Sequence, residues 1–196
     1  MKKIVLASKS PRRKELLESI GINFTVHSSD AEEEFNNDAL PWEVVEQLAL
    51  MKAESISFHY NDAIIIGADT IVVYEDTILG KPKNEMEAFN MLKQLQGQVH
   101  QVFSGLALIN TSTGVFLVSH RMTKVHMYPL TDDEIHFYIS TNEPMDKAGS
   151  YGIQGIGSLF IEKIEGDYYN VVGLPLSLLR QLLTSLKVDI VKDLIQ

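Results

Sequence analysis

Apolar positions along this chain follow two different spacings, which together predict an α/β protein. Short apolar runs rich in Ile and Val, such as "KIVLA" at 3–7 and "AIIIGADTIVVY" at 63–74, are typical of buried strands. Between them, apolar residues recur every three or four positions, as in "PWEVVEQLALMKAESI" from Pro41 to about Ser57, which is the spacing of one helix face. Because the two kinds of segment alternate, we expect a mixed α/β domain.

Residues that start and stop helices set the bounds of the helical segments. Asn84 with Glu87, and Thr131 with Glu134 in "TDDE", match the capping box that opens a helix, and Gly97 follows the first of these helices as a stop. The predicted helices run from about Pro11 to Ile20, from Pro41 to Ser57, from Glu85 to Leu95, onward from Thr131 and onward from about Pro175.

The remaining apolar segments are predicted to be strands. A turn at Glu75 and Asp76 reverses the strand at 63–74 into "TILGKP", and the turn "TSTG" joins two long strands into a hairpin. The predicted strands not yet given are "INFTVHS" at 22–28, "HQVFSGLALIN" at 100–110, "VFLVSHRMTKVHMY" at 115–128, "SLFIEKI" at 158–164 and "YYNVVG" at 168–173.

Length and composition indicate one domain, 1–196, with or without two lobes, that has a core of its own. The sequence has no cysteine, which excludes disulfides, thiolate metal sites and thiol nucleophiles, so the chemistry must come from oxygen and nitrogen groups. The apolar runs are shorter than a membrane span needs, and "MKKIVLASKS" is too short a run for a signal peptide. We therefore expect a soluble, cytoplasmic protein that does not associate with membranes.

The net charge of -9 disfavours polyanionic partners. Binding of nucleic acid over a broad face normally shows as a basic stripe, so we do not expect a nucleic-acid partner. The six histidines have no metal-ligand spacing, which gives a histidine-based metal site little support. A small basic pocket for a small anion remains compatible with this composition.

The helix predicted to begin at Pro11 carries Arg12 and Arg13 in its first turn, where the exposed amide groups already make the helix end positive. The other predicted helices with N-terminal signals place Asp or Glu there instead. Guanidinium groups match phosphate oxygens, and the preceding Ser8, Lys9 and Ser10 add donors, so we expect a phosphate site. The alternative is that both arginines extend into solvent.

Two charged residues interrupt apolar patterns. Lys52 falls on the same helical stripe as Val45 and Leu48, so it either reaches the surface along its aliphatic stem or serves a site. Asp69 lies inside "IIIGADTIVV", where an unpaired carboxylate would be costly. We favour a polar cleft in which Asp69 is a metal ligand or general base, over a turn that breaks the strand.

Further charged residues could complete such a site. The acidic cluster "DAEEEF" at 30–35 is typical of a solvated loop, but one of its carboxylates together with Asp69 could hold a divalent cation that bridges phosphates. Lys81 in "GKP" and Lys147 in "MDKAG" could either lie on the surface or reach a phosphate. The segment "AGSYGIQGIG" is neither a Walker loop nor a dinucleotide motif, although its glycines could let Gln154 approach a flat ligand.

The stretches "LASKSPRRKELL", "GADT", "GKP" and "EPMDKAGSYGIQG" together resemble the Maf family of nucleoside triphosphate pyrophosphatases over nearly the whole chain. The resemblance implies an elongated, two-lobed fold of the inosine-triphosphatase type, with a central mixed sheet, an active-site cleft and homodimers. It also implies hydrolysis of a nucleoside triphosphate to a monophosphate and pyrophosphate with Mg²⁺ or Mn²⁺.

The resemblance also assigns roles to matching residues. Asp69 is similar to the general base of the family and, with Glu33, to its metal ligands, and Lys52 and Lys81 act beside it in catalysis. Phosphate binding and base selection fall on the remaining matches, which are Ser8, Arg12, Arg13, Thr70, Lys147 and Gln154. One branch of the family prefers 7-methylguanosine triphosphate and has a bulky aromatic residue at the first arginine; "SPRR", "GADT" and "YGIQG" are similar to the dTTP and UTP branch instead.

The sequence thus predicts a pyrophosphatase acting on dTTP, UTP and their modified analogues. The same reaction on a purine or methylated nucleotide is the enzyme alternative. A nucleotide-binding regulator of septum formation, which the resemblance also implies, is the alternative from another class. A regulator would bind nucleotide without releasing pyrophosphate, so product release separates the two.

Overall fold

The structure, a computed structural model, describes residues 2–29 and 39–190, and the chain divides into two compact units. Unit 1 comprises residues 1–69, 104–121 and 173–196, and unit 2 comprises residues 70–103 and 122–172. The helices of unit 1 are α1 (Pro11–Ser19), α2 (Pro41–Ser57) and α6 (Leu176–Ser185), and those of unit 2 are α3 (Glu85–Leu95), α4 (Asp132–Ser140) and α5 (Tyr168–Val172).

Seven strands are found among the described residues, and they form one mixed sheet. They are β1 (Lys3–Leu6), β2 (Thr25–Val26), β3 (Ala63–Tyr74), β4 (Thr77–Leu79), β5 (Val99–Asn110), β6 (Val115–Met127) and β7 (Ile161–Glu165). The order is β2-β1-β3-β5-β6-β7, with β4 on β3. Strand β1 is parallel to β2 and β3, whereas β4 and β7 are antiparallel to their partners. This confirms the predicted mixed α/β class with a central mixed sheet.

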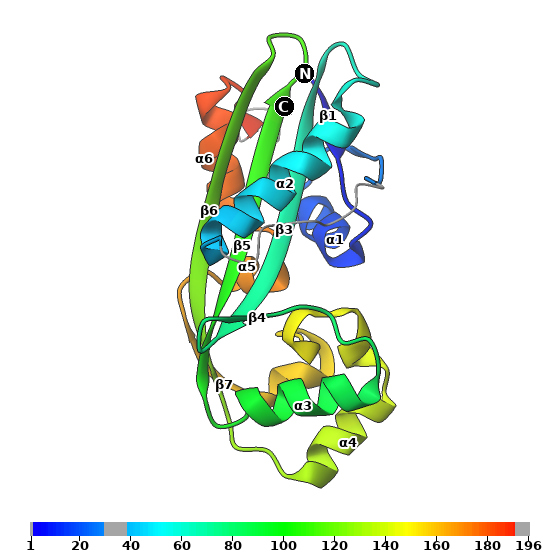
Figure 1. Ribbon diagram of the computed structural model, residues 1–196. Coiled ribbons are helices and arrows are strands. Elements are labelled where there is room, and N and C mark those ends of the chain that lie inside the picture. The colour runs from blue at the N-terminus through cyan, green and yellow to red at the C-terminus, as the bar shows by residue number, and fades with distance from the viewer. Residues whose placement is uncertain (1, 30–38, 191–196) are drawn as a thin grey trace. The chain divides into compact units, whose positions relative to one another are not determined.

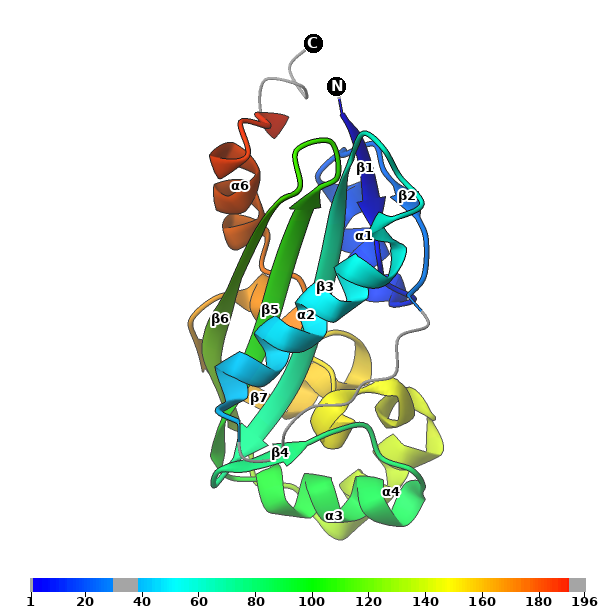
Figure 2. The same cartoon turned by 45° about the horizontal axis from the view of Figure 1, so that its top comes forward.

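In unit 1, α2 lies in front of β3 and β5, as Figures 1 and 2 both show, and glycines make the approach unusually close. A Cβ added at Gly67 of β3 would lie 2.1 Å from the carbonyl oxygen of Ala49, and one at Gly105 of β5 would lie 2.1 Å from that of Val45. The helix backbone therefore contacts the strand backbone directly, without intervening side chains. The core beside it is built from small and β-branched residues, among them Val5, Ala7, Ala49, Ala53, Ile65 and Ala107.

The first turn of α2 is tied to β6 by the single tryptophan of the sequence. The ring of Trp42 stacks on that of His120, with 6.4 Å between centroids and 25° between planes. His120 Nδ1 also lies 2.7 Å from a carboxylate oxygen of Glu46, one turn further along α2. These contacts fix the N-terminal half of the helix on the sheet.

Unit 2 has a separate core around α3 and α4, whose starts follow the predicted caps. The side chain of Asn84 accepts a hydrogen bond from the amide of Glu87 at 2.9 Å, and Thr131 Oγ1 accepts one from the amide of Glu134 at 3.3 Å. The buried residues of this core include Val72, Leu79, Ala88, Leu92, Val102, Val125, Ile135, Tyr138, Tyr151 and Phe160. Among residues 2–29 and 39–190, every helix is too short or too polar to cross a bilayer.

The strand predicted for "YYNVVG" is wrong, because residues 168–172 form helix α5. Asp167 Oδ1 accepts a hydrogen bond from the amide of Tyr169 at 2.8 Å, as a residue at a helix start does. The buried side chain of Asn170 donates to the carbonyl of Val102 at 2.9 Å. These contacts outweigh the strand propensity of the aromatic and β-branched residues.

Two predicted strands are shorter than expected. "INFTVHS" keeps only Thr25 and Val26 as β2, which pair with Val5 and Leu6 of β1. The first residues of "SLFIEKI" belong instead to a 3₁₀ turn, η3 (Gly155–Phe160), so β7 begins at Ile161. The η3 turn completes the glycine-rich segment, which also holds the 3₁₀ turns η1 (Glu143–Asp146) and η2 (Ala148–Ser150).

A buried histidine joins β5 to the glycine-rich segment inside unit 2. His100 is 2 % exposed, and its Nε2 atom lies 2.6 Å from the hydroxyl of Tyr151. Burial, and then the proximity of His126, lowers the pKa of His100 from 6.5 to about 4. His100 is therefore neutral in the folded protein near pH 7.

We expect His100 to destabilise the fold in mild acid. Between pH 6.5 and about 4 the unfolded chain binds a proton at this ring and the folded chain does not, so the free energy of unfolding falls as the pH falls. One such proton contributes a slope of up to about 1.4 kcal/mol per pH unit. Urea unfolding at a series of pH values should give a shallower slope for His100→Gln. The same change at the exposed His136 should leave the slope as it is, and equal slopes for all three proteins would contradict the prediction.

Candidate active site

A buried ion pair joins α2 to the middle of β3. Lys52 Nζ lies 2.5 Å from Asp69 Oδ1, and the two side chains are 11 % and 9 % exposed. Strand β3 is continuous through Asp69, so the alternative of a turn at this position is wrong. Lys52 contacts a partner in the structure rather than solvent, which favours the interpretation that it serves a site.

The geometry of this pair follows from the close packing of α2. Residues 67 and 69 point to the same face of β3, because side chains alternate along a strand. Lys52 lies three residues after Ala49, one of the two residues nearest to Gly67, and so on the same side of the helix as Ala49. Because Gly67 has no side chain, α2 packs close enough to β3 for Lys52 to contact Asp69, two residues after Gly67.

A second polar group surrounds the start of α1. Arg13 is 9 % exposed; its Nε donates to the carbonyl of Gly173 at 2.9 Å and its Nη1 donates to Ser8 Oγ at 3.1 Å. Ser8 Oγ also accepts a hydrogen bond from the amide of Ser10 at 3.2 Å. The alternative that Arg13 extends into solvent is therefore wrong, and part of its guanidinium group stabilises the fold. Arg12, its neighbour, is half-buried.

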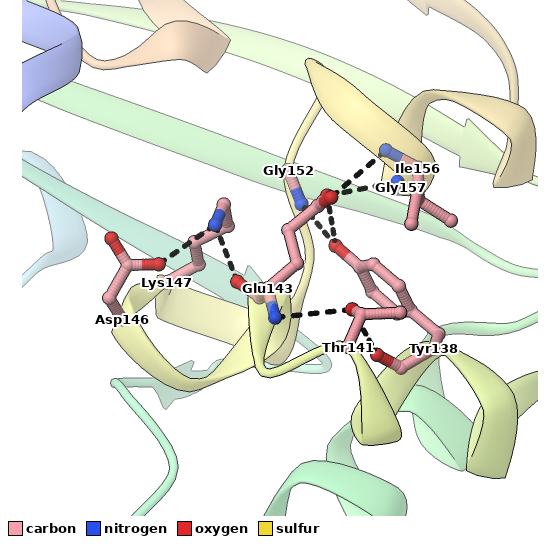
Figure 3. Close-up of polar contacts among 8 residues, drawn as sticks. All are labelled: Tyr138, Thr141, Glu143, Asp146, Lys147, Gly152, Ile156 and Gly157. Atoms are coloured by element: carbon pink, nitrogen blue, oxygen red, sulfur yellow. Dashed lines mark hydrogen bonds and ion pairs between the residues drawn. The ribbon is translucent and has the colours of Figure 1, made fainter.

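Unit 2 carries the other candidates. Thr70 is half-buried and follows Asp69 in β3, Lys81 is exposed after β4, and Gln154 is exposed just before η3. The Lys147 side chain is 13 % exposed, and its Nζ atom donates to the carbonyl of Glu143 at 2.5 Å and contacts Asp146 Oδ1 at 2.8 Å (Figure 3).

The sequence reasoning missed Glu143, which is the centre of this network (Figure 3). Its carboxylate accepts hydrogen bonds from the amides of Ile156 and Gly157, both at 3.0 Å, and from the hydroxyl of Tyr138 at 2.9 Å. Partial burial alone raises the pKa of Glu143, but the amide donors, Tyr138 and the Lys147 ammonium together hold that pKa below its ordinary value. A glutamate next to a glycine-rich segment is the one signal that the sequence offered.

Within unit 1 the structure thus brings together Lys52 with Asp69, and Ser8 with Arg13. Within unit 2 it places Lys147 and Gln154 on one glycine-rich segment. The predicted metal ligand Glu33, like most of the acidic cluster, lies outside the described residues. Among residues 2–29 and 39–190, no three histidine, aspartate or glutamate side chains are grouped so as to hold a metal ion.

The chain matches a family model described as "Maf-like protein" over residues 3–186. It is 50% identical over 184 residues to a dTTP/UTP pyrophosphatase of Alkaliphilus metalliredigens, covering 93% of this chain and 95% of the relative. It is 52% identical over 186 residues to a dTTP/UTP pyrophosphatase of Dictyoglomus thermophilum, covering 94% and 96%. A dTTP/UTP pyrophosphatase of Bacillus cereus is 50% identical over 190 residues, covering 97% and 93%.

Among solved structures, the Ham1 protein of Staphylococcus aureus matches with a TM-score of 0.47 and 17% identity, over 82% of this chain and 80% of that one.

Proposed function

Because this chain belongs to the Maf family, we propose that it hydrolyses dTTP and UTP, with their modified analogues, to a nucleoside monophosphate and pyrophosphate. The full-length relatives that carry the name dTTP/UTP pyrophosphatase support this substrate class. The structural observation that carries the proposal is the buried Asp69 paired with Lys52 in the middle of β3.

Asp69 acts as the general base in this proposal. Its carboxylate orients a water molecule and takes a proton from it as the water oxygen bonds to a phosphorus and the phosphoanhydride bond breaks. Lys52 holds the carboxylate in place by its contact at 2.5 Å, and it adds positive charge where the triphosphate is negative. Because the Lys52 side chain is already fixed by this contact, it loses little conformational entropy when the substrate binds.

A divalent cation, Mg²⁺ or Mn²⁺, fits the donor set at Asp69. A carboxylate has two oxygens with about four lone-pair positions, so it can accept the Lys52 ammonium and also contact a hard cation. The predicted second ligand is Glu33. When bound, such a cation would neutralise phosphate charge and lower the pKa of a coordinated water.

Phosphate binding falls on the cationic candidates. Arg12 and Arg13 lie in the first turn of α1, a helix start with no side-chain capping bond and no acidic residue, which supports an anion site. Ser8 adds a donor after the end of β1. Lys81 and Lys147 are the cationic candidates of unit 2. That all these residues share one cleft stays a prediction, as do the cytoplasmic location and the homodimer.

We assign base selection to Gln154, and also to Thr70 and Arg12. Uracil and thymine present an acceptor, a donor and an acceptor along one edge, and a carboxamide offers both complementary groups. Cytosine reverses part of this pattern, so it would leave polar groups unpaired and bind less well. The exposure of the Gln154 side chain is consistent with contact to a ligand.

Product analysis tests the proposal directly. We expect the purified protein with Mg²⁺ to release pyrophosphate and monophosphate from dTTP and UTP, and to do so more slowly from CTP and purine triphosphates. Hydrolysis in ¹⁸O-labelled water would locate the attacked phosphorus. Binding of nucleotide without release of pyrophosphate would sink the proposal and favour a regulator; preference for a purine or 7-methylguanosine triphosphate would correct the substrate.

A further inference from the structure

The carboxylate of Glu143, a residue of η1, is contacted from two other parts of unit 2 (Figure 3). The Tyr138 hydroxyl reaches it from α4, and the amides of Ile156 and Gly157 reach it from the start of η3. Hydrogen bonds from amides to a carboxylate are stronger than those between neutral groups. We call residues 147–157 the glycine loop. Glu143 therefore fixes the C-terminal end of the glycine loop.

The middle of the glycine loop, at Gly152, is held by the same tyrosine. The amide of Gly152 donates to the Tyr138 oxygen at 3.2 Å, while the hydroxyl hydrogen of Tyr138 points to Glu143. Gln154 lies between these two attachments, two residues after Gly152 and two before Ile156. Its backbone position is thus set from both sides, although its own side chain is exposed.

Two glycines of the loop leave room for the side chains of Glu143 and Tyr138. A Cβ at Gly155 would lie 2.6 Å from Glu143 Oε2, and a Cβ at Gly157 would lie 2.5 Å from the Tyr138 hydroxyl. Gly155 also has a φ of +69°, a conformation that favours glycine. The loop backbone therefore lies directly against the two side chains, and a residue with a side chain at either position would displace it.

We propose that Glu143 is a positioning residue for base selection, which holds the glycine loop so that the Gln154 carboxamide meets the edge of a pyrimidine base. This inference rests on the proposed function. Glu143 does not touch the substrate in this account, because its carboxylate is occupied by three donors of the protein. It acts only through the loop, so its loss should affect discrimination between bases more than turnover.

Glu143→Gln is the principal variant. It keeps the size of the side chain but places an NH₂ group against backbone N–H donors, so at least one contact becomes repulsive. We expect the ratio of kcat/KM for UTP to kcat/KM for CTP to fall by about tenfold or more, since misplacement of a polar contact by a fraction of an ångström removes much of its selectivity. Amide hydrogen exchange at Ile156 and Gly157 should become faster in the free protein.

Tyr138→Phe is the second variant, and it keeps the ring that packs edge-on against Phe160. It removes only the hydroxyl shared by Glu143 and Gly152, so it should lower the same ratio even if Glu143→Gln fails to fold. Glu162→Gln makes the same chemical change at an exposed position of β7 and should leave the ratio and the exchange rates unchanged.

A double-mutant cycle with Gln154→Ala decides between positioning and a general structural role. If Glu143 acts through Gln154, Glu143→Gln should not lower the UTP to CTP ratio further once Gln154 is alanine. An unchanged ratio in the single variants, or an equal additional fall in the Gln154→Ala background, would overturn the inference while the proposed function stands. A wild-type protein that releases no pyrophosphate from any triphosphate would overturn the proposed function, and this inference with it.

Discussion

Asp69→Asn should release pyrophosphate from dTTP or UTP about 10² to 10⁴ times more slowly than the wild-type protein, which is the usual contribution of a positioned general base. The amide keeps the shape of the carboxylate, but it cannot take a proton from water or carry the charge that contacts Lys52. Steady-state rates at saturating nucleotide and Mg²⁺ provide the measurement. Asp62→Asn, the same change at a side chain that is 67 % exposed, is the matched control and should keep its activity.

Loss of activity through unfolding needs a separate test, because Asp69→Asn leaves the Lys52 ammonium, only 11 % exposed, without its carboxylate. The double variant Asp69→Asn with Lys52→Met removes that unbalanced charge. It should recover stability in urea unfolding without recovering activity. If the double variant, or Asp69→Asn alone, hydrolyses UTP at close to the wild-type rate, Asp69 is not the base.

Gly67→Ala should lower the free energy of unfolding by about 3 kcal/mol or more, at or beyond the upper end of the usual cost of overpacking. The added methyl group would lie 2.1 Å from the carbonyl oxygen of Ala49, which is backbone and cannot rotate away. Helix α2 must then move off β3, and this separates Lys52 from Asp69. We expect turnover to fall together with stability, although residue 67 itself carries no functional group.

Gly80→Ala is the control for stability, since a Cβ at Gly80 meets nothing within 4 Å and the residue has no positive φ. That change should be neutral or should stabilise by about 0.4 to 1 kcal/mol through the unfolded state. Urea unfolding followed by circular dichroism gives both values. Equal stabilities for the two variants would contradict the direct contact between helix and strand.

Much of the fold follows from local signals. The bounds of β3 and the starts of α3 and α4 were predicted correctly, because apolar runs and capping residues act over a few neighbouring positions. Helix α5 was missed, because a contact between distant positions opposes local propensity there. The Asn170 side chain donates to the carbonyl of Val102, 68 residues away, and the residues of the segment itself do not predict that contact.

Some residues of the candidate site could likewise be predicted from local sequence, and others could not. Lys52 and Asp69 were found because each is a charge inside an apolar pattern, where only a partner or a function explains it. Glu143 was missed because acidic residues in a loop are usually solvated, and its partners are mainly backbone amides, which every sequence has. The role of Arg13 in holding the carbonyl of Gly173, 160 residues away, was equally invisible from its neighbours.

The stacking of Trp42 on His120 has a practical consequence. Since this is the only indole in the chain, ultraviolet emission at the tryptophan wavelength comes from the first turn of α2 alone. Trp42 is 38 % exposed, so loss of its contact with His120 would expose the ring further and shift that emission to the red. The intrinsic fluorescence of Trp42 therefore reports whether the start of α2 stays packed on β6, without any attached label.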